Sequence, residues 1–322
     1  ERRMGRRFRK INRALDSKKN YLILGAFLIC FTSVSADIPN DKFKTLLNNN
    51  EINEAIELYN THGKQKWAYW LAKKFIRNGD IDSANEWYEE SIKKGDQNAM
   101  FEIAEVLFHN KIDYSKSYNY FYELKNSSDK FLSSYAKYYL SIFHRYGINV
   151  PLNESVAYEY MIDASKEIEL AKYSLIEYEL NGIGTKIDKK NAALMMFEFA
   201  DQGYTEAEYD YAMMILNEIG IKKDEKIAIR WLERSAQKAY PPALQQLATM
   251  YYYGIGTVKN DVKAYEYYLL AKQLGVTDVE LDMNMSTLSS GLRKAAVDKF
   301  ENFRPRMNEY SITYLRMPKF MK

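Results

Sequence analysis

A repeat of 36 residues in the second half of the chain constrains its fold more than any other feature. The interval separates an opening alanine and an inner glycine in three consecutive copies, at Ala171, Ala207 and Ala243 and at Gly184, Gly220 and Gly256. Self-similarity at a fixed period of this length is typical of proteins that stack one supersecondary unit many times. A single unit cannot bury its apolar face alone, so neighbouring units must pack against one another.

The pattern within each copy predicts two helices joined by a glycine turn. In the third copy, the residues that recur before and after the turn are Ala243, Leu247, Ala248 and Tyr251, and Ala264, Tyr267, Tyr268 and Ala271. Their spacing places side chains on one face of a helix. Gly254-Ile255-Gly256 separates the two runs, since glycine adopts left-handed backbone conformations at low cost. We therefore predict an all-α solenoid of about six to seven helix-hairpin repeats plus a C-terminal capping helix.

The repeat pattern divides the chain into six segments. It is eroded upstream of the three clear copies, where Trp87 recurs four periods later as Trp231. Terminal copies are expected to be atypical because they face solvent on one side. The predicted segments are a signal peptide (1–36), an N-terminal partial helical hairpin (37–62), degenerate repeats (63–170), well-formed repeats (171–275), a capping helix (276–304) and a tail (305–322).

The first 36 residues have the pattern of a secretory leader. A basic segment precedes the uncharged run Tyr21–Phe31, and Val34-Ser35-Ala36 follows it. This order predicts a signal peptide cleaved after Ala36, and hence a bacterial protein that is periplasmic or secreted. An uncleaved membrane anchor is the alternative, although the apolar run is shorter than the ~20 residues of a comfortable span.

Charge and cysteine content exclude several classes of function. Residues 1–36 hold nine of the 46 Lys and Arg residues and two of the 43 Asp and Glu residues, which leaves 37 basic and 41 acidic residues in the remainder. The remainder therefore lacks the basic excess of a nucleic-acid-binding protein. Cys30 is the only cysteine, so a cleaved chain has no disulfide, no thiol nucleophile and no cysteine metal ligand.

The stretch ALQQLATMYYYGIGTVKNDVKAYEYYLLAKQLG resembles the Sel-one-like repeat (SLR) family, a relative of the tetratricopeptide repeat. The matching residues are Ala243, Leu247-Ala248, Tyr251, Gly254, Gly256, Asn260, Lys263-Ala264, Tyr267, Ala271 and Gly275. The match is specific over 171–275 and partial over 63–170. It departs at Glu218, where the first glycine of the turn is missing, so this turn is expected to be strained or to extend the helix. The resemblance implies a right-handed superhelix that acts as an adaptor and, in bacteria, is often exported.

No pattern in the sequence predicts catalysis, a metal site or a cofactor. His62, His109 and His144 never share a helical i, i+4 spacing and have no cysteine partners. The Ser-x-x-Lys motif of serine acyl enzymes begins at Ser91 and at Ser235. These two positions lie four repeat periods apart, so we interpret the motif as a by-product of one packing position.

Partner-binding residues are inferred from the resemblance, because in related repeats certain first-helix positions face the concave groove. These positions lie at −1, +2, +6 and +9 from the opening alanine. The residues predicted to bind a partner are Leu170, Tyr173, Glu177, Glu206, Tyr209, Met213, Gln245, Thr249 and Tyr252. Tyrosine and methionine are common interface anchors, which suits a peptide or helix partner. The alternative is that they are ordinary half-exposed helix residues.

The function that we expect is that of an exported, non-catalytic adaptor that binds a protein partner through its concave face, in envelope assembly or signalling. An immunity protein that neutralises a secreted toxin is one alternative. A scaffold or binder for exopolysaccharide secretion, with tyrosines against sugar rings, is another. No nucleic acid or cofactor is expected, and membrane contact is expected only through an uncleaved leader.

Overall fold

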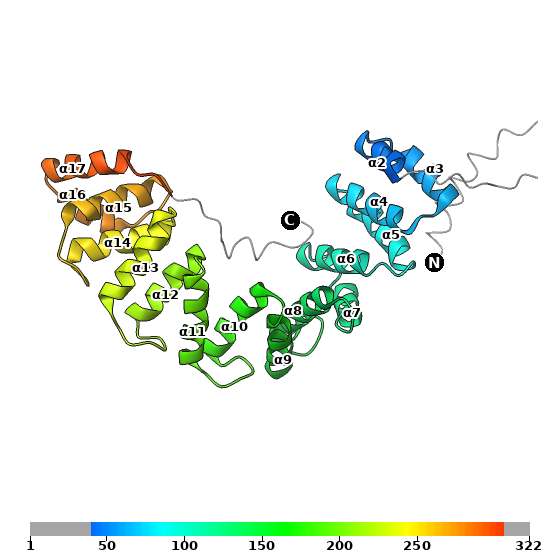
Figure 1. Cartoon of the computed structure of the whole chain (residues 1–322), viewed down its shortest axis with the longest axis horizontal. Helices are drawn as coiled ribbons and strands as arrows, with labels where there is room; N and C mark the ends of the chain where they lie inside the picture. The colour runs from blue at the N-terminus through cyan, green and yellow to red at the C-terminus, as the bar shows by residue number, and fades with distance from the viewer. Residues whose placement is uncertain (1–39, 306–322) are drawn as a thin grey trace, which may run out of the picture. The chain divides into compact units, whose positions relative to one another are not determined.

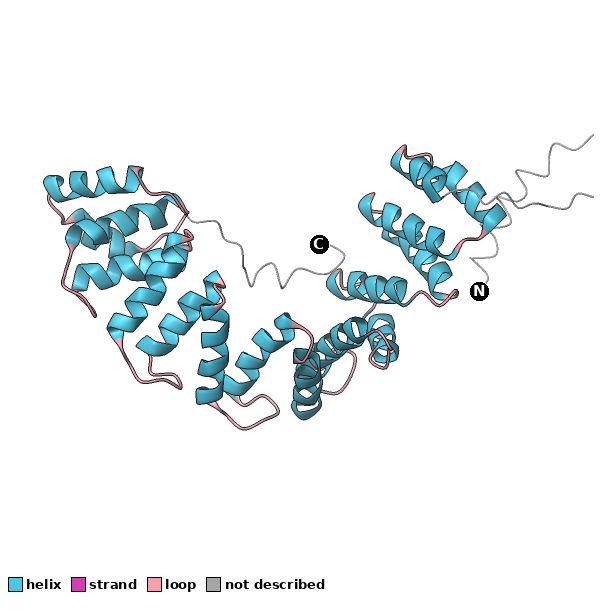
Figure 2. Cartoon of the chain, viewed as in Figure 1, coloured by secondary structure: helices cyan, strands magenta, loops and turns pink. Residues whose placement is uncertain are grey.

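The computed structural model describes residues 40–305, which form sixteen helices and no strand (Figure 2). The helices are α2 Asn40–Asn48, α3 Ile52–His62, α4 Gln65–Arg77, α5 Ile81–Ile92, α6 Gln97–His109, α7 Tyr114–Leu124, α8 Lys130–Tyr146, α9 Glu154–Ser165, α10 Glu169–Asn181, α11 Lys189–Asp201, α12 Thr205–Leu216, α13 Glu225–Gln237, α14 Pro241–Tyr253, α15 Asp261–Gln273, α16 Val279–Ser286 and α17 Ser290–Glu301. The predicted signal peptide and all of the predicted tail except Pro305 lie outside the described residues.

The chain divides into two compact units, residues 1–55 and 56–322. The described part of the first unit holds α2 and the start of α3. Phe43 and Leu47 of α2 are buried and lie four residues apart, on one face of the helix. The turn after α2 places Asn50 at a φ of 65° and is closed by the Glu51 N–H, which donates to the Leu46 carbonyl. These elements occupy the range predicted for a partial opening hairpin.

The second unit is a row of helical hairpins in chain order (Figure 1). Each first helix packs against the second helix that follows it, as in α4 with α5, α8 with α9, α12 with α13 and α14 with α15. Each second helix also packs against the next first helix, as α9 does against α10 and α13 against α14. The second unit is therefore built by the stacking of neighbouring hairpins, and the prediction of an all-α solenoid of hairpin repeats is confirmed.

Asparagine or aspartate begins the second helix of successive hairpins. Asn153, Asp188, Asp224 and Asn260 are the N-caps of α9, α11, α13 and α15. Each side chain accepts a hydrogen bond from the backbone N–H three residues later, at 2.9–3.1 Å. Such a cap satisfies one of the N–H groups that the first turn of a helix leaves unpaired. The recurrent Asp/Asn position is thus a helix start signal.

The inner glycine of the repeat lets adjacent hairpins approach closely. A Cβ atom on Gly184 would lie 2.0 Å from the Glu154 carbonyl oxygen, and one on Gly220 would lie 1.8 Å from the Lys189 carbonyl oxygen. Both carbonyls belong to the first residue of the second helix in the preceding hairpin, α9 or α11. No larger residue fits at either position without movement of the backbone.

The turn at Glu218 is strained. Glu218 has a φ of 55°, which is the left-handed conformation that Gly182 and Gly254 adopt at the same repeat position. An L-residue pays a steric penalty there that glycine does not. The helix α12 ends at Leu216 and is not extended, so of the two sequence-based expectations the strained turn is correct.

The end of the array differs from the single capping helix predicted over 276–304. Two helices, α16 and α17, occupy this range. Ser289 begins α17, because its hydroxyl accepts a hydrogen bond from the Leu292 N–H, and α17 packs against α15. Among residues 40–305, no helix combines the length and the apolar composition that a membrane span requires.

Candidate functional site

Two of the residues predicted to bind a partner are buried in the packing between repeats. Leu170 and Tyr173 on α10 are 6% and 9% exposed. The Tyr173 hydroxyl donates to Asp210 Oδ2 on α12 at 2.8 Å, and its ring packs edge-on against Phe199 with centroids 5.2 Å apart. The Tyr173 hydrogen bond therefore ties α10 to the next hairpin, whereas Leu170 belongs to the core cluster that α10 shares with α9.

Glu177 lies at the surface but already has a partner within the fold. Arg145 of α8 donates from Nη1 to Glu177 Oε2 at 3.0 Å and also bonds the second carboxylate oxygen. The hydrogen bond to Glu177 raises the pKa of Arg145, because it favours the charged guanidinium. This bidentate pair joins two consecutive first helices and neutralises the charge of Glu177 within the fold.

Three other predicted residues come together in one groove. Tyr209 of α12 with Gln245 and Thr249 of α14 line a cavity of about 330 Å³. The complete lining, which we call the α12–α14–α16 groove, is Tyr209, Pro242, Gln245, Gln246, Thr249, Tyr253, Asp278, Glu280, Leu281 and Asn284. These residues lie on three successive first helices, α12, α14 and α16, and include Asp278, the N-cap of α16. The remaining predicted residues, Glu206, Met213 and Tyr252, are half-buried on α12 and α14 and do not line the groove.

The groove residues of α16 and its N-cap were not identified from the sequence. Asp278, Glu280, Leu281 and Asn284 fall in the segment that was interpreted only as a capping helix. The repeat period could have identified them. Tyr209 and Gln245 are 36 residues apart, and a further 36 residues lead to Leu281. The groove therefore continues the repeat register by one further copy.

The carboxylates of the groove are held by neutral donors. Asp278 accepts hydrogen bonds from the Leu281 backbone N–H at 3.0 Å and from Gln245 Nε2 at 2.6 Å. These two bonds lower the pKa of Asp278, so this carboxyl group is ionised at neutral pH. Glu280 Oε1 accepts from the Tyr253 hydroxyl at 3.2 Å. Asn284 Nδ2 also donates to that hydroxyl, at 3.0 Å.

The wall of the groove on α12 is aromatic. The Tyr209 ring packs edge-on against Tyr240, with centroids 5.5 Å apart and an interplanar angle of 64°. Burial, and secondarily the charge of Asp210, raises the pKa of Tyr209, so its hydroxyl stays neutral and can donate a hydrogen bond. The groove thus combines an aromatic wall on α12 with a polar, negatively charged wall on α16.

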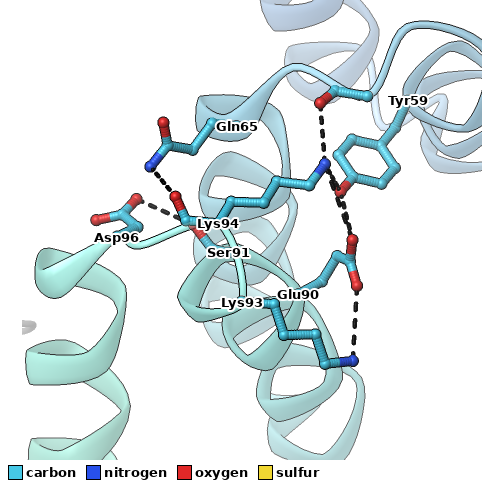
Figure 3. A network of polar contacts seen from close by, with 8 residues as sticks. Tyr59, Gln65, Glu90, Ser91, Lys93, Lys94 and Asp96 are labelled. Carbon is cyan, nitrogen blue, oxygen red and sulfur yellow. Dashed lines mark hydrogen bonds and ion pairs between the residues drawn. The ribbon is translucent and has the colours of Figure 1, made fainter.

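The side chains of the two Ser-x-x-Lys motifs are engaged in hydrogen bonds within and between hairpins. In the first, Ser91 donates to Asp96 Oδ2 at 3.0 Å, while Lys94 Nζ donates to the Tyr59 hydroxyl at 2.6 Å (Figure 3). Lys94 Nζ also donates to the Gly63 carbonyl at 2.9 Å. This geometry supports the interpretation of the motif as a packing position.

The second copy repeats part of this arrangement. Ser235 donates to the buried Thr205 carbonyl at 2.9 Å, and Lys238 Nζ donates to the Gly203 carbonyl at 2.7 Å. Both lysines therefore bond a glycine carbonyl in the preceding hairpin. Within residues 40–305, no group of three or more His, Cys, Asp or Glu side chains could hold a metal ion.

The fold and the groove define a helical-repeat protein whose surface is built by stacked hairpins. A family model, the Sel1 repeat, matches residues 68–96, 134–167, 205–240 and 241–276. The chain therefore contains four Sel1 repeats, as the sequence resemblance implied. Two of the matched segments lie in the range predicted as degenerate, and the hairpin α10–α11 is not matched although it has the same architecture.

Solved structures share this fold at low sequence identity. A protective antigen present in uropathogenic Escherichia coli strains, which displays an SLR fold, aligns with a TM-score of 0.57 and 18% identity over 78% of this chain and 55% of that one. This chain thus spans about half the length of that antigen. A Sel1 repeat protein from Oxalobacter formigenes aligns with a TM-score of 0.57 and 17% identity, over 73% of this chain and 100% of that one.

The C-terminal part of a TPR repeat-containing protein from Cytophaga hutchinsonii gives a TM-score of 0.52 and 14% identity, over 77% of this chain and 99% of that one. At such identities, the similarity shows a common fold. None of the curated proteins with which the sequence was compared matches it. Sel1-repeat proteins generally act as scaffolds for protein interactions and are typically non-catalytic.

Proposed function

We propose that this protein is an exported, non-catalytic scaffold that binds a protein partner on the first-helix side of its repeats, with the α12–α14–α16 groove as the anchor site. The observation that carries the proposal is that side chains from three consecutive first helices line one cavity. Such a surface exists only when the hairpins are stacked. Repeat proteins bind partners through extended surfaces of this kind.

The composition of the groove supports a peptide-like ligand. Aromatic side chains in a small pocket, surrounded by groups that form hydrogen bonds, are typical of the centres of protein interfaces. The groove supplies tyrosine rings, a proline, amide groups and two carboxylates within about 330 Å³. This volume suits one or a few side chains of a partner segment rather than a whole domain.

Export is the second part of the proposal and rests on the leader pattern of residues 1–36. Its test is the N-terminal sequence of the protein recovered from the envelope and the medium of a bacterial host. A mature chain that begins at Asp37 supports cleavage after Ala36. A full-length chain held in the membrane fraction would contradict cleavage and support an anchor instead.

Site-specific photo-crosslinking tests the groove. A benzophenone amino acid replaces Gln246, which lines the groove, or Gln237, which is exposed on the second helix α13 and serves as the matched control. We expect one protein to be crosslinked from position 246 and not from position 237. The additional change Tyr209→Ala should abolish this crosslink without changing the circular dichroism spectrum. Identical products from both positions, or no product from 246, would contradict the proposal.

A further inference from the structure

We infer that the α12–α14–α16 groove selects a basic segment of the partner, with a lysine or arginine side chain seated between Asp278, Glu280 and the ring of Tyr253. This inference rests on the proposed function and names the chemistry of the ligand. It follows from three separate observations: the charge of the groove helices, the state of their carboxylates and the exposure of the tyrosine.

The helices that line the groove contain no basic residue. Neither α12 nor α14 nor α16 has a lysine, arginine or histidine within its bounds, and none of the ten lining residues is basic. The second helices of the same hairpins do carry them, for example Lys226, Arg230 and Arg234 on α13. The groove is therefore the acidic side of this part of the array, and it attracts cations.

Ion pairs neutralise two other acids on these helices but not the two in the groove. Glu208 on α12 is buried and pairs with Arg234 at 3.0 Å and with Lys238 at 2.9 Å. Asp282 on α16 pairs with Lys272 at 2.7 Å. Asp278 and Glu280 form no ion pair with any residue in the described range 40–305, and accept hydrogen bonds only from neutral donors. Their charge remains available to a cationic ligand.

Tyr253 offers its ring rather than its hydroxyl to a ligand. The hydroxyl is occupied by Glu280 and Asn284, and the ring of Tyr252 packs edge-on against that of Tyr253 with centroids 5.0 Å apart, yet the residue as a whole is 51% exposed. An ammonium or guanidinium group over a tyrosine ring is attracted by the negative face of the ring. The neighbouring Tyr252 already has this contact, with Lys259 Nζ 4.7 Å from its ring centroid.

An anionic ligand does not fit the same groove. It would lie beside two carboxylates, without a basic side chain to compensate, and such a placement of like charges is unfavourable. A neutral peptide could use the aromatic wall, but it would leave Asp278 and Glu280 without a counter-charge. A basic segment supplies a counter-charge to the two carboxylates and can also pack against the aromatic wall.

Peptide titration tests the inference. The acetylated peptides Gly-Lys-Tyr-Lys-Gly, Gly-Gln-Tyr-Gln-Gly and Gly-Glu-Tyr-Glu-Gly are titrated into the mature protein, and the shifts of backbone amide resonances give the dissociation constants. We expect shifts in α14 and α16 with the lysine peptide, which should bind about fivefold more tightly than the glutamine peptide. This preference should shrink between about 50 mM and 500 mM salt.

Matched charge variants complete the test. The double variant Asp278→Asn/Glu280→Gln should lose the lysine preference, whereas Asp282→Asn, on the same helix but in an ion pair, should keep it. Asparagine is also a good N-cap, so α16 is retained. Equal binding of the lysine and glutamate peptides, or an unchanged preference in the double variant, would overturn the inference. Tighter binding of a synthetic peptide of residues 306–322 would assign the groove to this chain's own segment and would also overturn it.

The two proposals fail in different ways. If the protein partner still crosslinks from position 246 in the double variant with undiminished yield, the groove binds a partner but not through a basic segment. If no partner crosslinks in any variant, the proposed function itself is wrong.

Discussion

Gly220→Ala is the sharpest single test of how these hairpins stack. The added Cβ atom would lie 1.8 Å from the Lys189 carbonyl oxygen and 2.4 Å from its carbonyl carbon. Both atoms belong to the backbone at the start of α11, which cannot rotate away as a side chain can. The hairpin α12–α13, whose turn contains Gly220, must therefore move away from the preceding hairpin α10–α11, and the alanine must also adopt a φ of 71°.

The expected loss of stability has two parts. A left-handed L-residue costs about 1–2 kcal/mol, and forcing an atom into a packed contact with the backbone adds about 1–3 kcal/mol. The lower entropy of alanine in the unfolded chain offsets about 0.4–1 kcal/mol. The free energy of unfolding should therefore fall by about 3 kcal/mol in Gly220→Ala.

Gly275→Ala separates these parts. Gly275 has a φ of 85°, but no atom lies within 4 Å of the position that the Cβ of an alanine would occupy. This variant has the conformational cost without the collision, and should lose only about 1 kcal/mol. Urea unfolding followed by circular dichroism gives both values, and hydrogen exchange of the α11 and α12 amides locates the loss. Equal losses in the two variants would refute close approach as the reason for glycine at position 220.

Three further outcomes follow from the described residues. Glu218→Gly should raise the free energy of unfolding by about 1 kcal/mol in urea titrations, because glycine relieves a φ of 55°; a decrease would contradict the strain. Ser235→Ala should lower it by about 1 kcal/mol in the same assay, because the buried Thr205 carbonyl, which also accepts a hydrogen bond within α12, loses the Ser235 hydroxyl as its second donor; an unchanged value would mean that water replaces the hydroxyl. Burial lowers the pKa of His109 and of His144, so the unfolded chain takes up protons first as pH falls through 6.5, and stability should decrease from pH 7 to pH 5. The double variant His109→Gln/His144→Gln should show a shallower decrease in thermal melts across that range, and an identical slope would exclude these histidines as its source.

The regular part of the fold could be predicted because two structural requirements of each hairpin recur in the sequence at the same 36-residue interval. The same 36-residue interval sets the glycine that permits close approach, as at Gly220, and the N-cap that begins each second helix, as at Asp224. Both signals depend on local backbone geometry, which a sequence expresses directly. The strain at Glu218 could be anticipated for the same reason.

The closing helices could not be predicted as they are. Apolar residues recur at helical spacing through the end of α16 and into α17, so the periodicity alone favours one long helix. The break depends on the Ser289 hydroxyl, which accepts the Leu292 N–H and begins a new helix. Serine fits both the interior and the start of a helix, and its role is set by the packing of α17 on α15.

Only some of the partner-binding residues inferred from the family resemblance line the groove. The exposure of each residue depends on its neighbours in the next hairpin. Tyr173, Tyr209 and Gln245 share one repeat position, yet Tyr173 is buried and the other two are half-buried at a cavity. Asp210 accepts the hydroxyl of Tyr173 and holds it in the interface between repeats. A one-dimensional register identifies a face of a helix, but it does not identify which residues of that face are covered.

The chain has 28 tyrosine residues, and many of them connect neighbouring hairpins. Many tyrosine hydroxyls donate to a carboxylate about one repeat away and so join adjacent hairpins. Such pairs include Tyr69 with Glu102, Tyr139 with Glu105, Tyr173 with Asp210 and Tyr204 with Glu169.

Tyr253 and Glu280 form a pair of the same type, but Tyr253 is half-exposed and Glu280 lacks a basic partner among the described residues. A buried pair serves only to hold the array together, because no ligand can reach it. An exposed pair with a net negative charge retains affinity for a cation after it has joined its two helices. Burial and neutralisation of the carboxylate, rather than the presence of tyrosine, therefore separate the residues that stabilise this array from those that we propose bind its partner.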